Sequence, residues 1–335
     1  MTLALLGMQF MLCAALIAGA GYVLCQSADA IARATGLTGG WMGLALLATV
    51  TSLPELASGI SAVTVMDAPN LAVGNALGAC VFNLVFLVVI DALQRREPIY
   101  CRASTAHLLS AAFGVVMLGF VAMSLLLPER APGLLHLGLY SPALLALYLL
   151  ALRSVFAHEQ ALRPPRDAQA DPDPAPAMTR EWRRFGLAAV VVVTAGSWLP
   201  SLADQLALVM GWSRSFVGTL FMALVTTLPE IAVTLSALRL RALDMAIGNL
   251  LGSNLFNVAI LAIDDIFYVR GPLLADASPV HAGTAVAAVV MTGLVMVGLV
   301  MRPQGRELRV LSWVSVGLLA TYLLNAALVF LHGGA

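Results

Sequence analysis

Two short segments of this sequence place an acid directly after a proline within a long apolar run. Glu55 closes the segment TSLPE at 51–55, and Glu230 closes TTLPE at 226–230. An unpaired acid at membrane mid-depth costs about 2.5 to 3.5 kcal/mol on insertion scales, so such residues usually serve function. No arginine lies near the middle of any apolar run to act as a partner. We therefore expect both glutamates to bind a ligand.

The prolines explain which other groups would join the acids. Pro54 has no N–H, and its ring clashes with the carbonyl four residues earlier, so the helix is expected to open around the carbonyls of 48–50. Thr51 and Ser52 add hydroxyls one turn from Glu55. Carbonyl, hydroxyl and carboxylate oxygens together form a hard-cation site that suits Ca²⁺ or Na⁺. The second segment repeats the arrangement with the carbonyls of 223–225, Thr226 and Thr227.

Amides and one further hydroxyl follow each segment. Ser253 and Asn257 stand four residues apart and so share a helix face. Asn257 and Asn83 are interpreted as ligands or gate residues, because a mid-membrane amide needs a partner. Asn75 and Asn249 lie near the starts of their apolar runs and are interpreted as helix caps.

Composition predicts an integral membrane protein. The chain has 335 residues, is 60% hydrophobic and 11% charged, and has a mean hydropathy of +0.92. Soluble domains carry about 25% charged residues. No nucleic-acid-binding pattern is present, and the expected surroundings are a lipid bilayer. Ten helical spans are predicted at Leu3–Gln26, Trp41–Met66, Ala68–Leu93, Thr105–Leu127, Leu134–Phe156, Phe185–Val209, Phe216–Leu240, Leu243–Phe267, His281–Met301 and Leu308–Leu331.

Arginine placement predicts an orientation. With ten spans, the loops on one face hold all of the arginines except Arg130, Arg214 and Arg270, which is fifteen of eighteen. Positive residues favour the cytoplasmic side. This predicts an inner (plasma) membrane protein with both termini outside and a flexible, proline-rich cytoplasmic linker at 157–183.

The two halves are internal repeats. The segment GNALGACVFN at 74–83 matches GNLLGSNLFN at 248–257, in the same order relative to the two acidic segments. Residues 1–156 and 184–335 are therefore each predicted to form one unit of five transmembrane helices. Because five is odd, the second unit enters the membrane from the opposite side, and the repeats are inverted.

The paired motifs resemble the two alpha-repeats of the sodium/calcium exchanger family, within the cation/calcium exchanger superfamily. The resemblance implies alternating access, with Ca²⁺ and a counter-ion competing for one site. Two departures stand out: the family's usual Gly-Ser-Asn reads Gly78-Ala79-Cys80 in the first repeat, and Val50 and Val225 replace a usual glycine. The ligands implied are Thr51, Ser52, Glu55, Asn83, Thr226, Thr227, Glu230, Ser253 and Asn257, with backbone oxygens of Ala48 and Ala223.

The leading interpretation is a secondary antiporter that exports Ca²⁺ in exchange for Na⁺, with no resident cofactor. Two central carboxylates balance one Ca²⁺, two Na⁺ or two H⁺, and Ala79 removes a sodium ligand, so a divalent cation/H⁺ antiporter is the alternative. A cation channel is a more distant alternative. An enzyme is not expected, since no nucleophile or metalloprotease motif is present. Asp91 and Asp265 are interpreted as hydrated helix ends, with a role as vestibule gates as the alternative. His107 and His281 are interpreted as interfacial structural residues, with proton sensing as the alternative.

Overall fold

The computed structural model describes residues 3–34, 48–94, 97–127, 136–162, 178–303 and 310–333, and every long element in this part of the chain is a helix. The prediction of an all-helical membrane protein is therefore confirmed. In chain order the helices are α1 (Leu3–Ala34), α3 (Leu53–Thr64), α4 (Pro69–Leu93), α5 (Ile99–Arg102), α6 (His107–Leu126), α7 (Tyr140–Leu162), α8 (Met178–Met210), α9 (Arg214–Phe216), the π-helical η2 (Val217–Met222), α10 (Ala223–Thr226), α11 (Leu228–Arg239), α12 (Leu243–Phe267), α13 (Leu273–Asp276), α14 (Val280–Met301) and α15 (Trp313–His332).

Within the described residues, eight helices are long and apolar enough to cross a membrane. A ninth candidate is the pair Arg214–Thr226 and Leu228–Arg239, which is bent by 44°. The predicted span Trp41–Met66 includes residues 41–47, which lie outside the described residues, so the count of ten stays a prediction. In the part of that span that is described, residues 48–51 are helical and α3 begins at Leu53.

Several predicted boundaries shift. The bounds of α12 agree with the prediction, but α1 continues to Ala34 and α8 begins at Met178, so both are longer than expected. α7 also continues to Leu162, so helices enter the predicted linker 157–183 from both sides. The prediction used only the apolar residues. The helices continue into neighbouring polar residues, at the end of α1 and α7 and at the start of α8.

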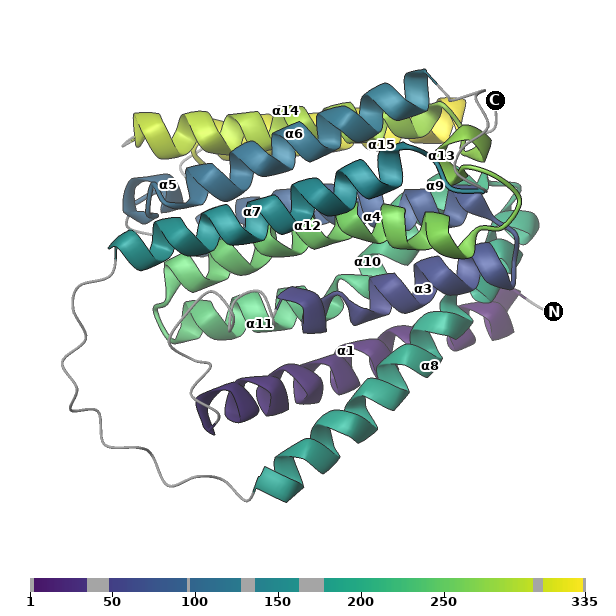
Figure 1. Cartoon of the computed structure of the whole chain (residues 1–335), viewed down its shortest axis with the longest axis horizontal. Helices are drawn as coiled ribbons and strands as arrows, with labels where there is room; N and C mark the ends of the chain where they lie inside the picture. Colours follow the sequence, from purple (N-terminus) through teal and green to yellow (C-terminus); the bar gives the residue numbers. More distant parts are fainter. Residues whose placement is uncertain are drawn as a thin grey trace.

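The inverted repeats are visible in matched elements. α3 and α11 have 12 residues each, and α4 and α12 have 25 each. The turns between them place Asp67 and Arg241, which are equivalent residues, at φ values of 48° and 60°, a conformation uncommon outside glycine. α3 and α11 run from the middle of the molecule toward opposite ends (Figure 1). We call these ends the Thr64 end and the Arg239 end.

α4 and α12 form the centre of the bundle, and α1 and α8 pack side by side along one edge (Figure 1). Both marked chain ends lie at the Thr64 end (Figure 1). α1, α8 and α15 expose large apolar side chains such as Met11, Leu187 and Leu324. Such surfaces suit contact with lipid rather than water.

Two buried acids fasten the repeats to each other, which corrects the interpretation of Asp91 and Asp265 as hydrated ends. Both are fully buried. Asp91 accepts hydrogen bonds from the backbone N–H of Ile99 and Ser312 and from the Ser315 hydroxyl, at 3.1, 2.9 and 2.7 Å. Asp265 accepts the equivalent bonds from Leu273, Gly138 and Ser141, together with one from Tyr140. Each acid thus joins its own repeat to the last long helix of the other.

Candidate cation-binding site

Glu55 and Glu230 lie in the first turns of α3 and α11, and both are fully buried. Each helix starts with a proline at its second residue, a position where the missing N–H is tolerated. The chain is helical on both sides of each break, so the two acids project from fixed helix ends rather than from loops. The breaks therefore put both carboxylates inside the bundle with little freedom to move.

Hydroxyls from the first repeat reach the acid of the second. The Ser52 hydroxyl donates to Glu230 Oε1 at 2.7 Å. The Thr51 and Ser253 hydroxyl oxygens lie 3.4 Å apart, across the interface between the repeats. The sequence spacing predicted that the hydroxyls of Thr51 and Ser52 lie beside Glu55, but the Ser52 hydroxyl donates to Glu230 instead.

The mirror-image contacts differ. Thr227, the equivalent of Ser52, donates to the Ala223 carbonyl at 2.9 Å instead of reaching Glu55. Thr226, the equivalent of Thr51, donates to Asn75 Oδ1 at 3.1 Å. As a result, neither carboxylate oxygen of Glu55 has a hydrogen-bond partner in the described part of the chain. The two glutamates are therefore equivalent in sequence but not in surroundings.

The two carbonyl oxygens predicted as backbone ligands already accept hydrogen bonds from the protein. The Ala48 carbonyl accepts from the Ser52 N–H at 3.2 Å and from the Thr51 hydroxyl at 3.0 Å. The Ala223 carbonyl accepts from the Thr227 N–H as well as from its hydroxyl. A carbonyl oxygen has two lone pairs, so a cation at either atom would replace a hydroxyl contact.

Asn75 and Asn249 do not cap helices, which corrects the prediction made for them. α4 and α12 begin six residues before each asparagine, without a side-chain cap. Their amide nitrogens instead approach the backbone carbonyls of Glu55 and Glu230, each at 3.5 Å. A short distance from the helix start had suggested a cap, but the turn of α4 and α12 on which they lie faces the helix breaks.

A pair of amides joins α4 of the first repeat to α12 of the second. Asn83 Nδ2 donates to Asn254 Oδ1 at 3.0 Å, and Asn254 Nδ2 donates to the Cys80 carbonyl at 3.3 Å. The Cys80 thiol lies 3.7 Å from the Asn254 carbonyl. Sequence reasoning did not select Asn254, although its place directly after Ser253 in the repeated motif was a usable signal. Asn257, one turn further along, has no partner among the described residues.

The arrangement can hold a cation through oxygen atoms. Both oxygens of Glu55, Glu230 Oε2 and Asn257 Oδ1 are buried and lack hydrogen-bond partners in the described residues. Among those residues, no group of three or more His, Cys, Asp or Glu side chains could hold a metal ion. A cation here would rely on two carboxylates supplemented by hydroxyl, amide and carbonyl oxygens, which is the chemistry of Ca²⁺ and Na⁺ rather than of Zn²⁺.

At the Arg239 end, a cavity of about 340 Å³ lies between α1, α11 and the start of α12. Next to the cavity, α1 and α11 are in close contact, since an added Cβ at Gly21 would lie 2.5 Å from Pro229 Cγ. Val233, three residues after Glu230, lines the cavity. Cys25, one turn beyond Gly21, already lines the cavity. The polar residues of the wall are Tyr22, Gln26, Asp29 and Ser236. The cavity thus begins about one helical turn from Glu230.

At the Thr64 end, the equivalent helices are joined instead. The Ser58 and Ser61 hydroxyls of α3 donate to the carbonyls of Gly196 and Ser197 on α8, at 2.8 and 2.6 Å. The counterpart of Ser61 in the other repeat is Ser236, which donates to Ala232 of its own helix and lines the cavity. The pair α3 and α8 is therefore joined by hydrogen bonds at the Thr64 end, whereas the equivalent pair α11 and α1 has a cavity between its helices at the Arg239 end.

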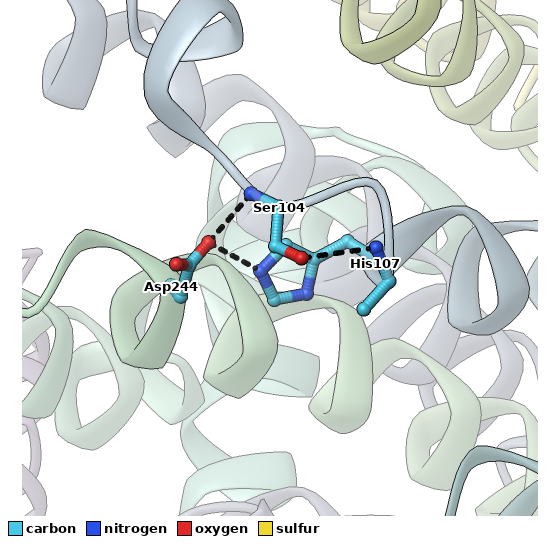
Figure 2. Close-up of polar contacts among 4 residues, drawn as sticks. Ser104, His107 and Asp244 are labelled. Atoms are coloured by element: carbon cyan, nitrogen blue, oxygen red, sulfur yellow. Dashed lines mark hydrogen bonds and ion pairs between the residues drawn. The ribbon is translucent and has the colours of Figure 1, made fainter. Parts of the chain in front are cut away.

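A second equivalent contact occurs at both ends. At the Arg239 end, Asp244 Oδ1 accepts from the Ser104 N–H at 2.7 Å and lies 3.1 Å from His107 Nε2 (Figure 2). At the Thr64 end, Asn70 Oδ1 accepts from the Ser278 N–H at 2.6 Å. The predicted structural role of His107 agrees with this contact. The equivalent His281 is fully buried, and neither of its ring nitrogens has a hydrogen-bond partner among the described residues.

Comparison with known proteins agrees with the fold and the repeated motifs. The family model described as sodium/calcium exchanger protein matches residues 5–156 and 182–331. This chain therefore belongs to the sodium/calcium exchanger family, and it is a multi-pass membrane transporter of the cation/calcium exchanger class rather than an enzyme.

Individual relatives cover most of the chain. It is 30% identical over 260 residues to the putative antiporter CaxA of Alkalimonas amylolytica, covering 75% of this chain and 76% of that one. It is 26% identical over 235 residues to the inner membrane protein YrbG of Escherichia coli, covering 70% and 71%. The solved sodium-calcium exchanger NCX_Mj superposes with a TM-score of 0.60 at 20% identity, covering 96% of this chain and 98% of that chain. That last likeness concerns the fold alone.

Proposed function

We propose that this protein exports Ca²⁺ in exchange for Na⁺ by alternating access, with Glu55 and Glu230 as the central ligands. The observation that carries the proposal is the difference between the repeats: α3 is bonded to α8, whereas α1 and α11 enclose a cavity. If the repeats exchanged these arrangements, the site would open to the other side. Inverted repeats with two broken helices favour alternating access over the continuous pore of a channel.

The ligand set supports a divalent cation as one substrate. Two carboxylates balance the charge of one Ca²⁺, and Ca²⁺ accepts six to eight oxygens from carboxylates, carbonyls and hydroxyls. Ser52 donates to Glu230, and the hydroxyls of Thr51 and Ser253 lie against each other at the interface between the repeats. We propose Thr226, Thr227, Asn83 and Asn257, with the Ala48 and Ala223 carbonyls, as the remaining ligands in the states that bind a cation.

The membrane and the orientation follow from charge and from one relative. We propose an inner-membrane location, supported by the likeness to YrbG, which is described as an inner membrane protein. The predicted arginine-rich loops lie at the Arg239 end, so this end faces the cytoplasm and the Thr64 end faces outward. In this orientation the structure is open to the cytoplasm and closed to the outside.

A proton is the second candidate for the counter-ion, and Ala79 favours it. Ala79 is fully buried at the position equivalent to Ser253, so α4 contributes no hydroxyl where α12 has one. Fewer neutral oxygens weaken a site for Na⁺ but leave the two carboxylates able to carry protons. Ca²⁺/Na⁺ exchange and Ca²⁺/H⁺ exchange would use the same site and differ only in the ion that is transported in the opposite direction to Ca²⁺.

The test is ⁴⁵Ca²⁺ uptake into everted vesicles, driven separately by a sodium gradient and by a proton gradient. Sodium-driven uptake that Glu55→Gln and Glu230→Gln each abolish is the expected result. Uptake driven only by a proton gradient would mean that the counter-ion is H⁺ rather than Na⁺. Uptake that survives both substitutions would refute the proposed site. Glu97→Gln is the matched control, because it removes an exposed acid outside the spans.

A further inference from the structure

One buried acid is not explained by the central site or by helix packing. Asp264 on α12 is fully buried, and neither carboxyl oxygen has a hydrogen-bond partner among the described residues. Its neighbour Asp265 accepts four bonds, Asp91 accepts three, and Asp204 pairs with Arg214. Of the buried acids that are described, Asp264 shares its lack of partners with Glu55.

The position of Asp264 continues the ligand-bearing face of α12. It follows Asn257 by seven residues and Ser253 by eleven, which returns it to the same face. Seven residues of helix correspond to roughly 10 Å, toward the Thr64 end. Across from it is Gly59, one turn beyond Glu55: an added Cβ there would lie 2.6 Å from Asp264 Oδ1. The carboxyl group occupies the space that the glycine leaves.

The other repeat shows that packing does not require an acid at this level. The residue equivalent to Asp264 is Ile90, which is fully buried. The residue equivalent to Gly59 is Thr234, whose hydroxyl accepts a bond from Asn249 at 3.3 Å. At this level an isoleucine and a threonine fill the space between the two helices in one location, whereas at the equivalent location the Asp264 carboxyl group packs against the backbone of Gly59. The acid therefore has a role beyond filling the layer.

We propose that Asp264 is a proton-binding site on the route between the central site and the Thr64 end. An ionised carboxylate without a donor or a cation is very costly in a buried setting, whereas the neutral acid is tolerated. While Ser58 and Ser61 hold α3 against α8, the Asp264 carboxyl carries a proton. When α3 and α8 part, water reaches the carboxyl, and the proton leaves to the Thr64 side.

The linkage has a definite sign. The closed state binds one proton more than the open state, so acid on the Thr64 side favours closure and alkali favours opening. For one coupled proton, the ratio of open to closed molecules changes by up to about tenfold per pH unit. The proposal holds whichever counter-ion drives transport, because this proton binds outside the central site.

Other titratable groups on and around α12 are otherwise engaged or distant. Burial and then the hydrogen bond to Asp276 raise the pKa of Tyr268 to about 12, so Tyr268 stays neutral. Asp67 and Arg270 pair with each other at 2.5 Å near the surface. Glu55 of α3 and Glu230 of α11 lie at the central site, and Asp91 of α4 and His107 of α6 lie at the Arg239 end. On α7, Tyr140 is bound to Asp265, and Tyr148, Arg153 and His158 follow further along the helix. Arg239 is the last residue of α11, the Cys80 thiol of α4 contacts the Asn254 carbonyl, and His136 contacts the Ile266 carbonyl.

Infrared difference spectroscopy on the purified full-length protein tests the protonation directly. Wild type minus Asp264→Asn should show the carbonyl band of one protonated carboxylic acid at neutral pH. The double variant Gly59→Thr/Asp264→Ile copies the layer of the other repeat and should lose the same band, which covers the case in which Asp264→Asn fails to fold. Identical acid bands in wild type and variants would overturn the proposal.

Transport supplies a second readout in reconstituted vesicles. Lowering the pH on the Thr64 side from about 8 to about 6 should slow ⁴⁵Ca²⁺ flux in wild type by severalfold or more, up to the limit of about tenfold per pH unit. Asp264→Asn should remove most of that pH dependence. If the ratio of the flux at about pH 8 to the flux at about pH 6 is the same in Asp264→Asn as in wild type, the proposal is wrong. The infrared result does not depend on flux, so failure of the antiport proposal is distinguishable from failure of this one.

Discussion

The bond from Ser58 to Gly196 gives the sharpest prediction about the closed end. Pro200 lies inside α8 and has no N–H, so the Gly196 carbonyl four residues earlier lacks its helical donor. The Ser58 hydroxyl supplies one at 2.8 Å. Ser58→Ala would leave this carbonyl unsatisfied only while the end is closed, at a cost of about 1–3 kcal/mol. The ratio of open to closed molecules should therefore rise by roughly 5- to 150-fold.

Hydrogen–deuterium exchange in lipid nanodiscs measures this shift. Amides of residues 56–64 should exchange faster in Ser58→Ala by about the same factor, because exchange follows the opening of α3 from α8. Ser236→Ala is the matched control, since Ser236 donates to its own helix and bridges no helices. Equal exchange in Ser58→Ala and wild type would refute the assignment of this contact as the closure.

Two further predictions concern single residues. Ala79→Ser introduces a hydroxyl at the position equivalent to Ser253, so the sodium concentration for half-maximal ⁴⁵Ca²⁺ exchange should fall severalfold; no change would mean that this hydroxyl is not a sodium ligand. Asp265→Asn places an NH₂ group among four donors that now surround the carboxylate, so it should lower the free energy of unfolding by about 2–5 kcal/mol. Thermal unfolding in detergent measures the loss, and a melting temperature equal to that of wild type would contradict the anchoring role.

The two helix breaks and the positions of the central acids could be predicted from the sequence because they depend on local rules. A proline before an acid in an apolar run predicted both breaks, and the motif register predicted which residues of the two repeats are equivalent. Those rules need only covalent geometry and helix periodicity. They placed Glu55, Glu230, Ser253 and Asn257 on the correct elements.

The sequence could not show which neighbour each polar group meets. Ser52 bonds Glu230 rather than Glu55, and Asn75 reaches a helix break rather than capping α4. Both outcomes depend on how the repeats pack against each other, which spacing within one helix does not specify. The bond from Ser58 to the carbonyl freed by Pro200 joins residues more than one hundred positions apart. The contact of the Asp264 carboxyl group with Gly59 likewise depends on how α12 packs against α3.

Calorimetric measurement of Ca²⁺ binding to the purified protein shows whether Glu55 and Glu230 form one cation site. We expect one Ca²⁺ to bind per chain, with an affinity that Glu55→Gln or Glu230→Gln lowers at least about tenfold and that Glu97→Gln leaves unchanged. The counter-ion should displace the bound Ca²⁺. Equal Ca²⁺ affinity in wild type and in both central variants would mean that the two glutamates do not form the site.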